Sequence, residues 1–234
     1  MKKSSKNRLT PRQQSFFSGN NLFDKIARAV CCAGTLPRKE LYEAWEMAKR
    51  VRRRFKGGRI IDLACGHGLL AHIMLILDDS SKIAIAVDQK IPLNAGKLSN
   101  ALITSWPRLK NRVIYKEVPV QEVTILPDDI VVSAHACGSL TDLIIDKAIE
   151  QHARVAVLPC CHDLKESSTD GLEGWMDKTL AVDTVRAVRL RSKGYQIVTQ
   201  KIPNDITPKN RLLMGEYLWN GGRATDSAAR PRLL

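Results

Sequence analysis

Residues 60–71 read IIDLACGHGLLA, an apolar run, an acidic residue and a glycine-rich turn that opens directly into a second apolar run. The first run predicts a short buried strand, and the run from Leu69 to Leu77 predicts a helix. Gly66 and Gly68 allow the positive φ and the close backbone approach that a ligand-binding turn needs. Asp88 ends the next expected strand, where a carboxylate can accept both hydroxyls of a ribose. This stretch therefore predicts a nucleotide-type ligand at the end of a strand in an α/β fold.

Strand-like and helix-like segments alternate on both sides of this stretch. Because parallel neighbours need crossover helices, the alternation predicts a doubly wound α/β sheet. Two later strands, expected at residues 195–201 and 211–219, flank a turn rich in proline and asparagine and are expected to pair antiparallel, which makes about seven strands. The other expected strands are residues 59–64, 82–87, 113–116, 130–134 and 153–158. The expected helices are residues 21–32, 37–56, 69–77, 93–104, 140–151 and about 175–190.

Charge divides the chain into unequal parts. The formal net charge is +13, and residues 1–60 carry 16 Lys and Arg against 4 Asp and Glu. We expect a flexible basic tail over residues 1–20, a basic helical segment over 21–57, the main domain over 58–220 and a second tail over 221–234. A cationic block of this kind favours a polyanion, most commonly nucleic acid, although a solvated face is the simpler alternative. Within it, Arg52, Arg53 and Arg54 are the residues expected to contact RNA.

Several classes of protein are disfavoured. The longest uncharged apolar stretch has nine residues, short of the ~18 that span a bilayer, and the basic N-terminus lacks the apolar segment of a secretory signal. We therefore expect a soluble, cytoplasmic protein without a membrane partner. The six cysteines include no CxxC pair, so neither a zinc ribbon nor a thioredoxin motif is present, and free thiols are expected.

Two cofactor classes suit the glycine-rich turn. Gly66-x-Gly68-x-x-Ala71 fits a loose dinucleotide fingerprint. Asp62, however, would repel a pyrophosphate, and it suits the amino group of a methionine moiety. With the C-terminal hairpin, the segment resembles the class I S-adenosylmethionine-dependent methyltransferases, whose first motif is apolar-apolar-acid-x-x-x-Gly-x-Gly. The resemblance covers about residues 59–219 and implies a Rossmann-like sheet. It also implies that S-adenosylmethionine is held by Asp62, Cys65, Gly66, His67, Gly68, Asp88 and Gln89.

Cysteine and histidine gather at the expected ends of the fourth and fifth strands. The motifs His135-x-Cys137-Gly138-x-x-Thr-Asp142 and Pro-Cys160-Cys161-His162 resemble a narrower branch of this superfamily. That branch includes the tRNA acceptor-stem ribose 2′-O-methyltransferases, whose zinc-finger modules this sequence lacks. The resemblance places His135 where the superfamily positions its substrate-orienting residue. Asp142 is expected to cap the following helix or to orient His135.

Three chemistries fit this edge. His135 can act as a general base for a hydroxyl or amine that attacks the methyl group. Alternatively, Cys137 or Cys160 can add to a pyrimidine ring, as in 5-methylcytosine enzymes. Thiolates and imidazole also suit zinc, but adjacent cysteines seldom bind one ion together, so no metal is predicted. His135 and Cys137 are the candidate catalytic residues, and the candidate substrate contacts also include Cys160, Cys161, His162 and Asn210.

The combined expectation is an S-adenosylmethionine-dependent methyltransferase that modifies RNA, either tRNA or rRNA. A methyltransferase acting on a protein or a small molecule is one alternative, with the basic block serving another partner. A non-catalytic RNA-binding module is the other, although such a module has no need of Asp62, Gly66, Gly68, Asp88 and His135 together. The sequence names neither the methylated atom nor the oligomeric state.

Overall fold

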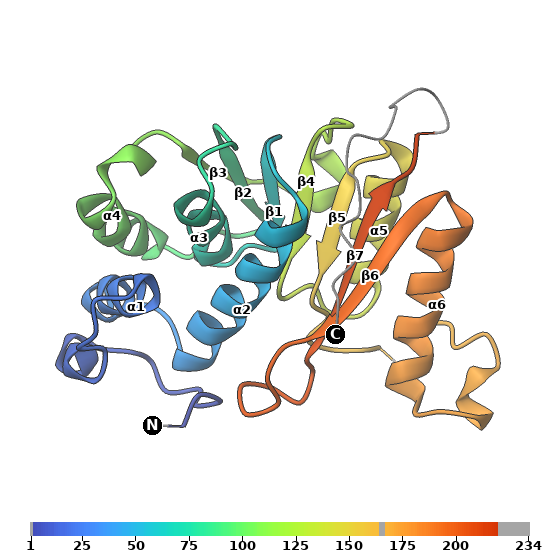
Figure 1. Cartoon of the computed structure of the whole chain (residues 1–234), viewed down its shortest axis with the longest axis horizontal. Coiled ribbons are helices and arrows are strands. Elements are labelled where there is room, and N and C mark those ends of the chain that lie inside the picture. Colours follow the sequence, from blue (N-terminus) through green and yellow to red (C-terminus); the bar gives the residue numbers. More distant parts are fainter. Residues whose placement is uncertain (1, 164–166, 220–234) are drawn as a thin grey trace, which may run out of the picture.

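The computed structural model describes residues 2–163 and 167–219. Its centre is a seven-stranded sheet in the order β3-β2-β1-β4-β5-β7-β6 (Figure 1). β1 to β5 are parallel, and β7 lies antiparallel between β5 and β6. This confirms the predicted fold class, a mostly parallel Rossmann-like sheet with a C-terminal antiparallel hairpin. The strands are β1 (Ile60–Leu63), β2 (Ala84–Asp88), β3 (Val113–Glu117), β4 (Ile130–Ser133), β5 (Arg154–Val157), β6 (Tyr195–Lys201) and β7 (Arg211–Tyr217).

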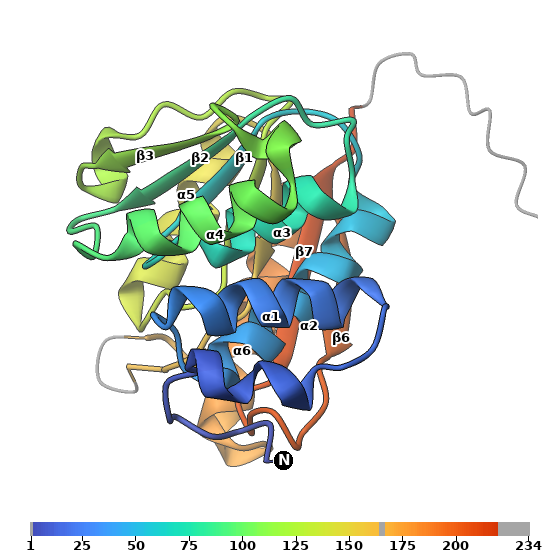
Figure 2. The same ribbon diagram turned by 90° about the vertical axis from the view of Figure 1, so that its left-hand side faces the viewer.

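Helices cover both faces of the sheet. The α-helices are α1 (Leu22–Ala33), α2 (Arg38–Arg54), α3 (Leu69–Leu77), α4 (Ala95–Ser105), α5 (Ser139–Glu150) and α6 (Lys178–Ser192). α1 to α4 lie on one side, and α5 and α6 lie on the other (Figures 1 and 2). Ile60 of β1 therefore packs in one core and Ile61 in the other. Because both faces are buried, the central strands are continuously apolar. Among the described residues, no helix combines the length and the apolar character that a membrane span requires.

The N-terminal residues 2–20 differ from the expected flexible tail. Leu9 and Phe17 are buried in the core with α1 and α2, and the Leu9 amide donates to the Leu36 carbonyl at 2.8 Å. The Arg28 guanidinium of α1 donates to the Gly19 carbonyl at 2.8 Å. The prediction of a flexible tail is therefore wrong for this segment, because two apolar side chains anchor an otherwise polar stretch. The second predicted tail, residues 221–234, lies outside the described residues.

The strand order creates a crevice between β1 and β4. From β1 the chain adds β2 and β3 on one side and then crosses back to place β4 on the other, and ligands of such sheets bind where the order reverses. β7 runs opposite to β5, so the β6–β7 turn, residues 202–210, lies at this same carboxyl edge. Figure 1 shows the N-terminus near that turn, and the Lys3 ammonium pairs with the Asp205 carboxylate at 2.7 Å. α2 starts at this edge and ends at the opposite, amino edge, next to β1.

Candidate active site

The glycine-rich turn after β1 is fixed by its neighbours. The Asp88 carboxylate at the end of β2 accepts a hydrogen bond from the Gly66 amide at 2.9 Å. The Tyr115 hydroxyl of β3 donates to the His67 carbonyl at 2.8 Å. Gly68 has φ of 74°, and a Cβ there would lie 2.9 Å from the Tyr115 hydroxyl. Only glycine fits this position, and the turn therefore has a single, preorganised conformation.

Asp62 of β1 is a buried carboxylate behind this turn, with 1% of its surface exposed. It accepts a hydrogen bond from the Ala71 amide in the first turn of α3 at 3.1 Å. Burial raises the pKa of Asp62 to about 7, and the charge of Asp88 adds to the rise, although the Ala71 amide opposes it. No basic side chain in the described part of the chain pairs with Asp62. A cationic group brought to this carboxylate would therefore be strongly favoured.

A small hollow connects Asp62 with His135. A second acid, Glu40 in the first turn of α2, also faces it. Its volume of about 20 Å³ admits a group the size of one water molecule. The residues that line it are Leu36, Glu40, Ala44, Asp62, Ala64, Cys65, His67, Leu69, Leu70, Ala134 and His135. Two carboxylates around so small a space suit an ammonium group.

The remaining predicted donor-binding residues lie along the turn toward β2. The His67 ring Nε2 and the Asn94 side-chain oxygen are 2.9 Å apart. Burial raises the pKa of the Cys65 thiol, so this residue stays neutral beside the two acids. Asp88 is half-buried and Gln89 is exposed, and neither lines the hollow. The structure therefore places the predicted donor-binding residues on one continuous turn and the adjoining strand end.

His135 follows β4 directly across the crevice from Asp62. Its imidazole is half-buried and forms no hydrogen bond with any described residue. Its backbone carbonyl lies 3.6 Å from the Cys137 sulfur and 3.5 Å from the Cys160 sulfur. The ring is thus free to interact with a substrate while its backbone is fixed by the neighbouring loop.

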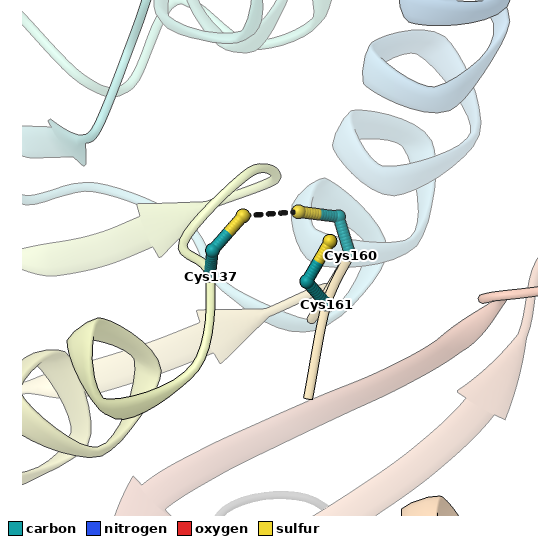
Figure 3. Close-up of side chains that lie close together, drawn as sticks. All are labelled: Cys137, Cys160 and Cys161. Atoms are coloured by element: carbon teal, nitrogen blue, oxygen red, sulfur yellow. Dashed lines mark hydrogen bonds between the residues drawn. The ribbon is translucent and has the colours of Figure 1, made fainter. Parts of the chain in front are cut away.

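The loops after β4 and β5 bring three thiols together. The sulfurs of Cys137 and Cys160 are 3.0 Å apart, and that of Cys161 lies within 4.8 Å of both (Figure 3). Burial raises the pKa of Cys160, and its contact with Cys137 adds to the rise. Burial opposes ionisation of Cys161, but hydrogen bonds from Cys137, Cys160 and Lys209 outweigh it and lower its pKa. The covalent alternative through Cys160 is thereby disfavoured, because the thiolate is the nucleophile.

A buried arginine ties these loops to α6. Arg186, 2% exposed, donates to both carboxylate oxygens of Asp142 at 2.8 and 2.7 Å and to the Gly138 carbonyl at 3.0 Å. Asp183 accepts from Arg211 at 2.5 Å and lies 2.7 Å from the His162 ring nitrogen. The sequence suggested that Asp142 caps α5 or orients His135, and the structure shows neither role. Asp142 instead accepts the hydrogen bonds of Arg186, which positions the loop after β4.

Two predicted substrate contacts have structural roles instead. The His162 side chain is 3% exposed, and its ring is paired with Asp183 inside the protein. Asn210 is 4% exposed, and its side-chain amide donates to the Ile202 carbonyl at 2.7 Å and to the Asn204 side-chain oxygen at 2.5 Å. Both residues shape loops at the carboxyl edge without being accessible to a substrate.

The predicted RNA contacts of α2 lie at the amino edge. Arg52 is 3% exposed and donates to the Met74 carbonyl at 3.0 Å and to the Ser81 hydroxyl at 2.7 Å, so its prediction as an RNA contact is wrong. Arg54 pairs with Glu216 at 3.2 Å, and Arg53 is exposed. With a rise of 1.5 Å per residue, the end of α2 is about 24 Å from its start at the crevice.

Comparison with known proteins supports this geometry. The sequence profile of a family described as "Methyltransferase domain" matches residues 38–167, more than half of the chain. The chain belongs to this methyltransferase family. Its fold is also that of an O-methyltransferase family protein from Burkholderia thailandensis, with a TM-score of 0.52 and 17% identity over 93% of this chain and 66% of that one. The chain thus contains a methyltransferase domain, and its family implies a methyl donor of the S-adenosylmethionine type.

Two curated relatives of this chain are glutathione S-transferase C-terminal domain-containing protein homologues. The one from Drosophila melanogaster is 26% identical over 204 residues, which cover 69% of this chain and 34% of the relative. The one from Drosophila pseudoobscura pseudoobscura is 22% identical over 210 residues, 69% of this chain and 33% of the relative. The chain spans about a third of the length of the curated relatives it matches.

Sequence reasoning missed several residues of the candidate site. Glu40 precedes the glycine-rich turn by over twenty residues, and no local signal assigns it to the hollow. Tyr115 and Asn94 support the turn from β3 and from the start of α4. Arg186 could have been suspected only from its position on an otherwise apolar helix face. All four act through contacts between segments that are distant in the sequence.

Proposed function

We propose that this methyltransferase transfers the methyl group of S-adenosylmethionine to a nucleophilic atom of RNA. One observation carries the proposal: Asp62, Glu40 and His135 line the same hollow, at the point where the strand order reverses. Two acids without a cationic partner in the described part of the chain suit the donor's amino group, and the imidazole beside them suits an acceptor that must lose a proton.

The residues around the hollow and the glycine-rich turn suit the functional groups of S-adenosylmethionine. Asp62 and Glu40 would hold its ammonium group, and Asp88, exposed to solvent beside Gln89, would accept hydrogen bonds from its ribose. The donor would rest on the backbone of the turn at Gly66, where even an added Cβ would meet no atom within 4 Å. When bound, such a donor supplies a methyl group on a positively charged sulfur, which an aligned nucleophile attacks directly.

His135 has the role that follows from its position. Its ring has no partner among the described residues and borders the hollow, so it can accept the proton of a hydroxyl or an amine as that atom attacks the methyl carbon. The proton moves to the imidazole and then to solvent. The Arg186 hydrogen bonds fix the following loop, and so position the backbone from which the ring extends toward the hollow.

The N-terminal segment is better placed to hold RNA than the end of α2. Lys6 and Arg8 are exposed, and no carboxylate within the described residues pairs with either. Arg8 forms a β-bridge with Pro37, next to Leu36 of the hollow, and Lys3 joins the segment to the β6–β7 turn. Free cations on an anchored segment beside the crevice supply the phosphate contacts that an RNA substrate needs.

Transfer of isotope-labelled methyl groups tests this function. RNA from cells that lack the protein is incubated with purified protein and labelled S-adenosylmethionine, and its nucleosides are resolved by mass spectrometry. We expect one labelled nucleoside with the wild-type protein and none with Asp62→Asn. Label that appears only in protein or in small molecules would contradict RNA as the substrate. Absence of donor binding, measured by calorimetry, would contradict the donor itself.

A further inference from the structure

Three cysteines of two neighbouring loops direct their sulfurs into one space. Cys137 follows β4, and Cys160 and Cys161 follow β5 (Figure 3). The two loops are joined by a β-bridge between Cys137 and Cys161 and by a hydrogen bond from the Gly138 amide to the Cys161 carbonyl at 3.0 Å. The three side chains are brought together by the backbone, independently of any bond between the sulfurs.

The spacing of the sulfurs matches a thiolate metal site. All three lie within 4.8 Å of one another, and the shortest separation is 3.0 Å. A zinc–sulfur distance of about 2.3 Å in a tetrahedral site separates two thiolates by about 3.8 Å. A shift of less than about 1 Å, within reach of a χ1 adjustment, would therefore bring the Cys137 and Cys160 sulfurs to that spacing.

We propose that Cys137, Cys160 and Cys161 form a binding site for a closed-shell thiophilic divalent cation of the zinc class, with its fourth coordination position open. The adjacency of Cys160 and Cys161, which argues against shared coordination in sequence, is overcome here because both sulfurs point to the same side of the loop (Figure 3). Cys137 and Cys161 are exposed, so an ion reaches the site directly from solvent.

The charges around the cluster balance such a site. Three thiols and one divalent ion release three protons and leave a net charge of −1 on the complex. The Lys209 ammonium lies 3.5 Å from the Cys161 sulfur and offsets that charge. Each of the three thiols would lose its proton to solvent. Cys137 and Cys160 would thereby give up their contacts with the His135 carbonyl.

A bound ion would clamp the loops that position His135. It would link the end of β4 to the end of β5, and so restrain the loop that carries His135 in addition to the Arg186 contacts with Gly138 and Asp142. The open position would face solvent at the carboxyl edge. This inference does not rest on the identity of the methylated substrate, because metal uptake is measured without RNA or donor.

Metal titration of the reduced full-length protein tests the site. Protein stripped with a chelator is titrated with Zn²⁺ in competition with a chromophoric chelator, and separately with Co²⁺, whose thiolate complexes show sulfur-to-metal charge-transfer absorption. We expect one ion per chain and a tetrahedral cobalt spectrum. Cys161→Ser and Cys137→Ser should each weaken binding at least tenfold, whereas Cys32→Ser, which alters an exposed cysteine on α1, should bind as the wild type does.

Three results would overturn the proposal. The first is failure of the reduced protein to bind Zn²⁺ or Co²⁺ in this competition. The second is equal binding by Cys137→Ser, Cys161→Ser and the wild type, with circular dichroism confirming that the variants fold. The third is formation of a Cys137–Cys160 disulfide under mild peroxide at the same rate with and without Zn²⁺, which would identify the cluster as a redox pair without metal affinity.

Discussion

Two buried carboxylates, one at each edge of the sheet, differ in their partners. At the amino edge, Arg59 makes two hydrogen bonds to the buried Asp129 carboxylate at 2.8 and 2.7 Å, and the buried Arg52 contacts Asp78 at 3.5 Å. At the carboxyl edge, Asp62 is buried without a cation, and the His135 ring has no partner in the described ranges. A buried polar group without a hydrogen-bond or ionic partner lowers the stability of the fold. Such groups are typical of sites where a ligand supplies the missing partner.

The amino edge should respond to mutation through stability. Arg52→Met keeps the volume of the side chain but removes a buried charge and leaves the Met74 carbonyl and the Ser81 hydroxyl without their donor. We expect the free energy of unfolding to fall by about 3 kcal/mol, measured by urea denaturation. Arg53→Met, one residue along the same helix and exposed, should change it by less than about 0.5 kcal/mol. Equal effects of the two substitutions would contradict the structural role of Arg52.

The carboxyl edge should respond through rate. His135→Ala removes a half-buried ring without hydrogen-bond partners among the described residues, so its stability should change little. Methyl transfer should slow by about a hundredfold or more, with the affinity for S-adenosylhomocysteine nearly unchanged. Single-turnover kinetics and calorimetry separate the two quantities. Normal turnover in His135→Ala, together with inactivity of Cys137→Ala and an adduct with 5-fluoropyrimidine RNA, would support the covalent alternative.

Donor binding should depend on pH through Asp62. Its pKa is raised to about 7 by burial, and a cationic ligand favours the ionised form, so binding below that pH must release a proton. Affinity for S-adenosylhomocysteine should therefore fall as pH drops below 7, by up to about tenfold per pH unit. Asp62→Asn should bind more weakly at pH 8 and lose most of this dependence. A wild-type affinity that is constant between pH 8 and pH 6 would show that Asp62 does not face the cation.

The same group affects the stability of the unliganded protein. In the unfolded chain Asp62 has its ordinary pKa, near 4, so it loses its proton between pH 4 and 7 while the folded protein retains it. The contribution of Asp62 to stability therefore declines as pH rises through this window. His72 acts in the opposite sense, because burial lowers its pKa to about 4 and stability is lost as pH falls from about 6.5.

The smallest expected effect is on the salt dependence of RNA binding, which should differ between the cations of the N-terminal segment and those of the amino edge. Replacing Lys6 and Arg8 together by glutamine should flatten the slope of log RNA affinity against log salt by about 1–2 units, because two phosphate contacts are lost. The matched control, Arg53→Gln with Lys56→Gln, removes two exposed cations at the amino edge and should leave the slope unchanged. A slope altered only by the control pair would place the RNA across the end of α2.

Local patterns accounted for the elements of this protein. Strand-like runs that alternate with helix-like segments predicted the seven strands, and Leu69–Leu77 is placed correctly because its apolar character and the preceding Gly68 are both local signals. The strand-turn-helix with its two acids led to the prediction of a donor-binding turn for a similar reason, since most of the residues that form it are nearly contiguous; donor binding there stays a prediction. The fold class followed from the alternation of these elements.

Charge density, in contrast, misassigned Arg52 of α2 as an RNA contact. Arg52 and Arg53 are the same residue type at adjacent positions. Arg52 points into the core and contacts Met74 and Ser81, whereas Arg53 is exposed to solvent. The predicted tail failed in the same way, because Leu9 and Phe17 matter through what they contact. Whether a side chain is buried depends on its position around the helix and on packing against distant segments. Composition contains neither kind of information.

The sequence by itself determined the sheet, the glycine-rich turn and the presence of His135 and the thiols after β4 and β5. Only the tertiary structure decided which of these groups meet: that Glu40 joins Asp62 and His135 around one hollow, that three sulfurs lie within 4.8 Å, and that Arg186 holds the loops between them. The physical reason is that secondary structure responds to short-range periodicity. A site is a set of distances between elements, and these depend on how the whole chain packs.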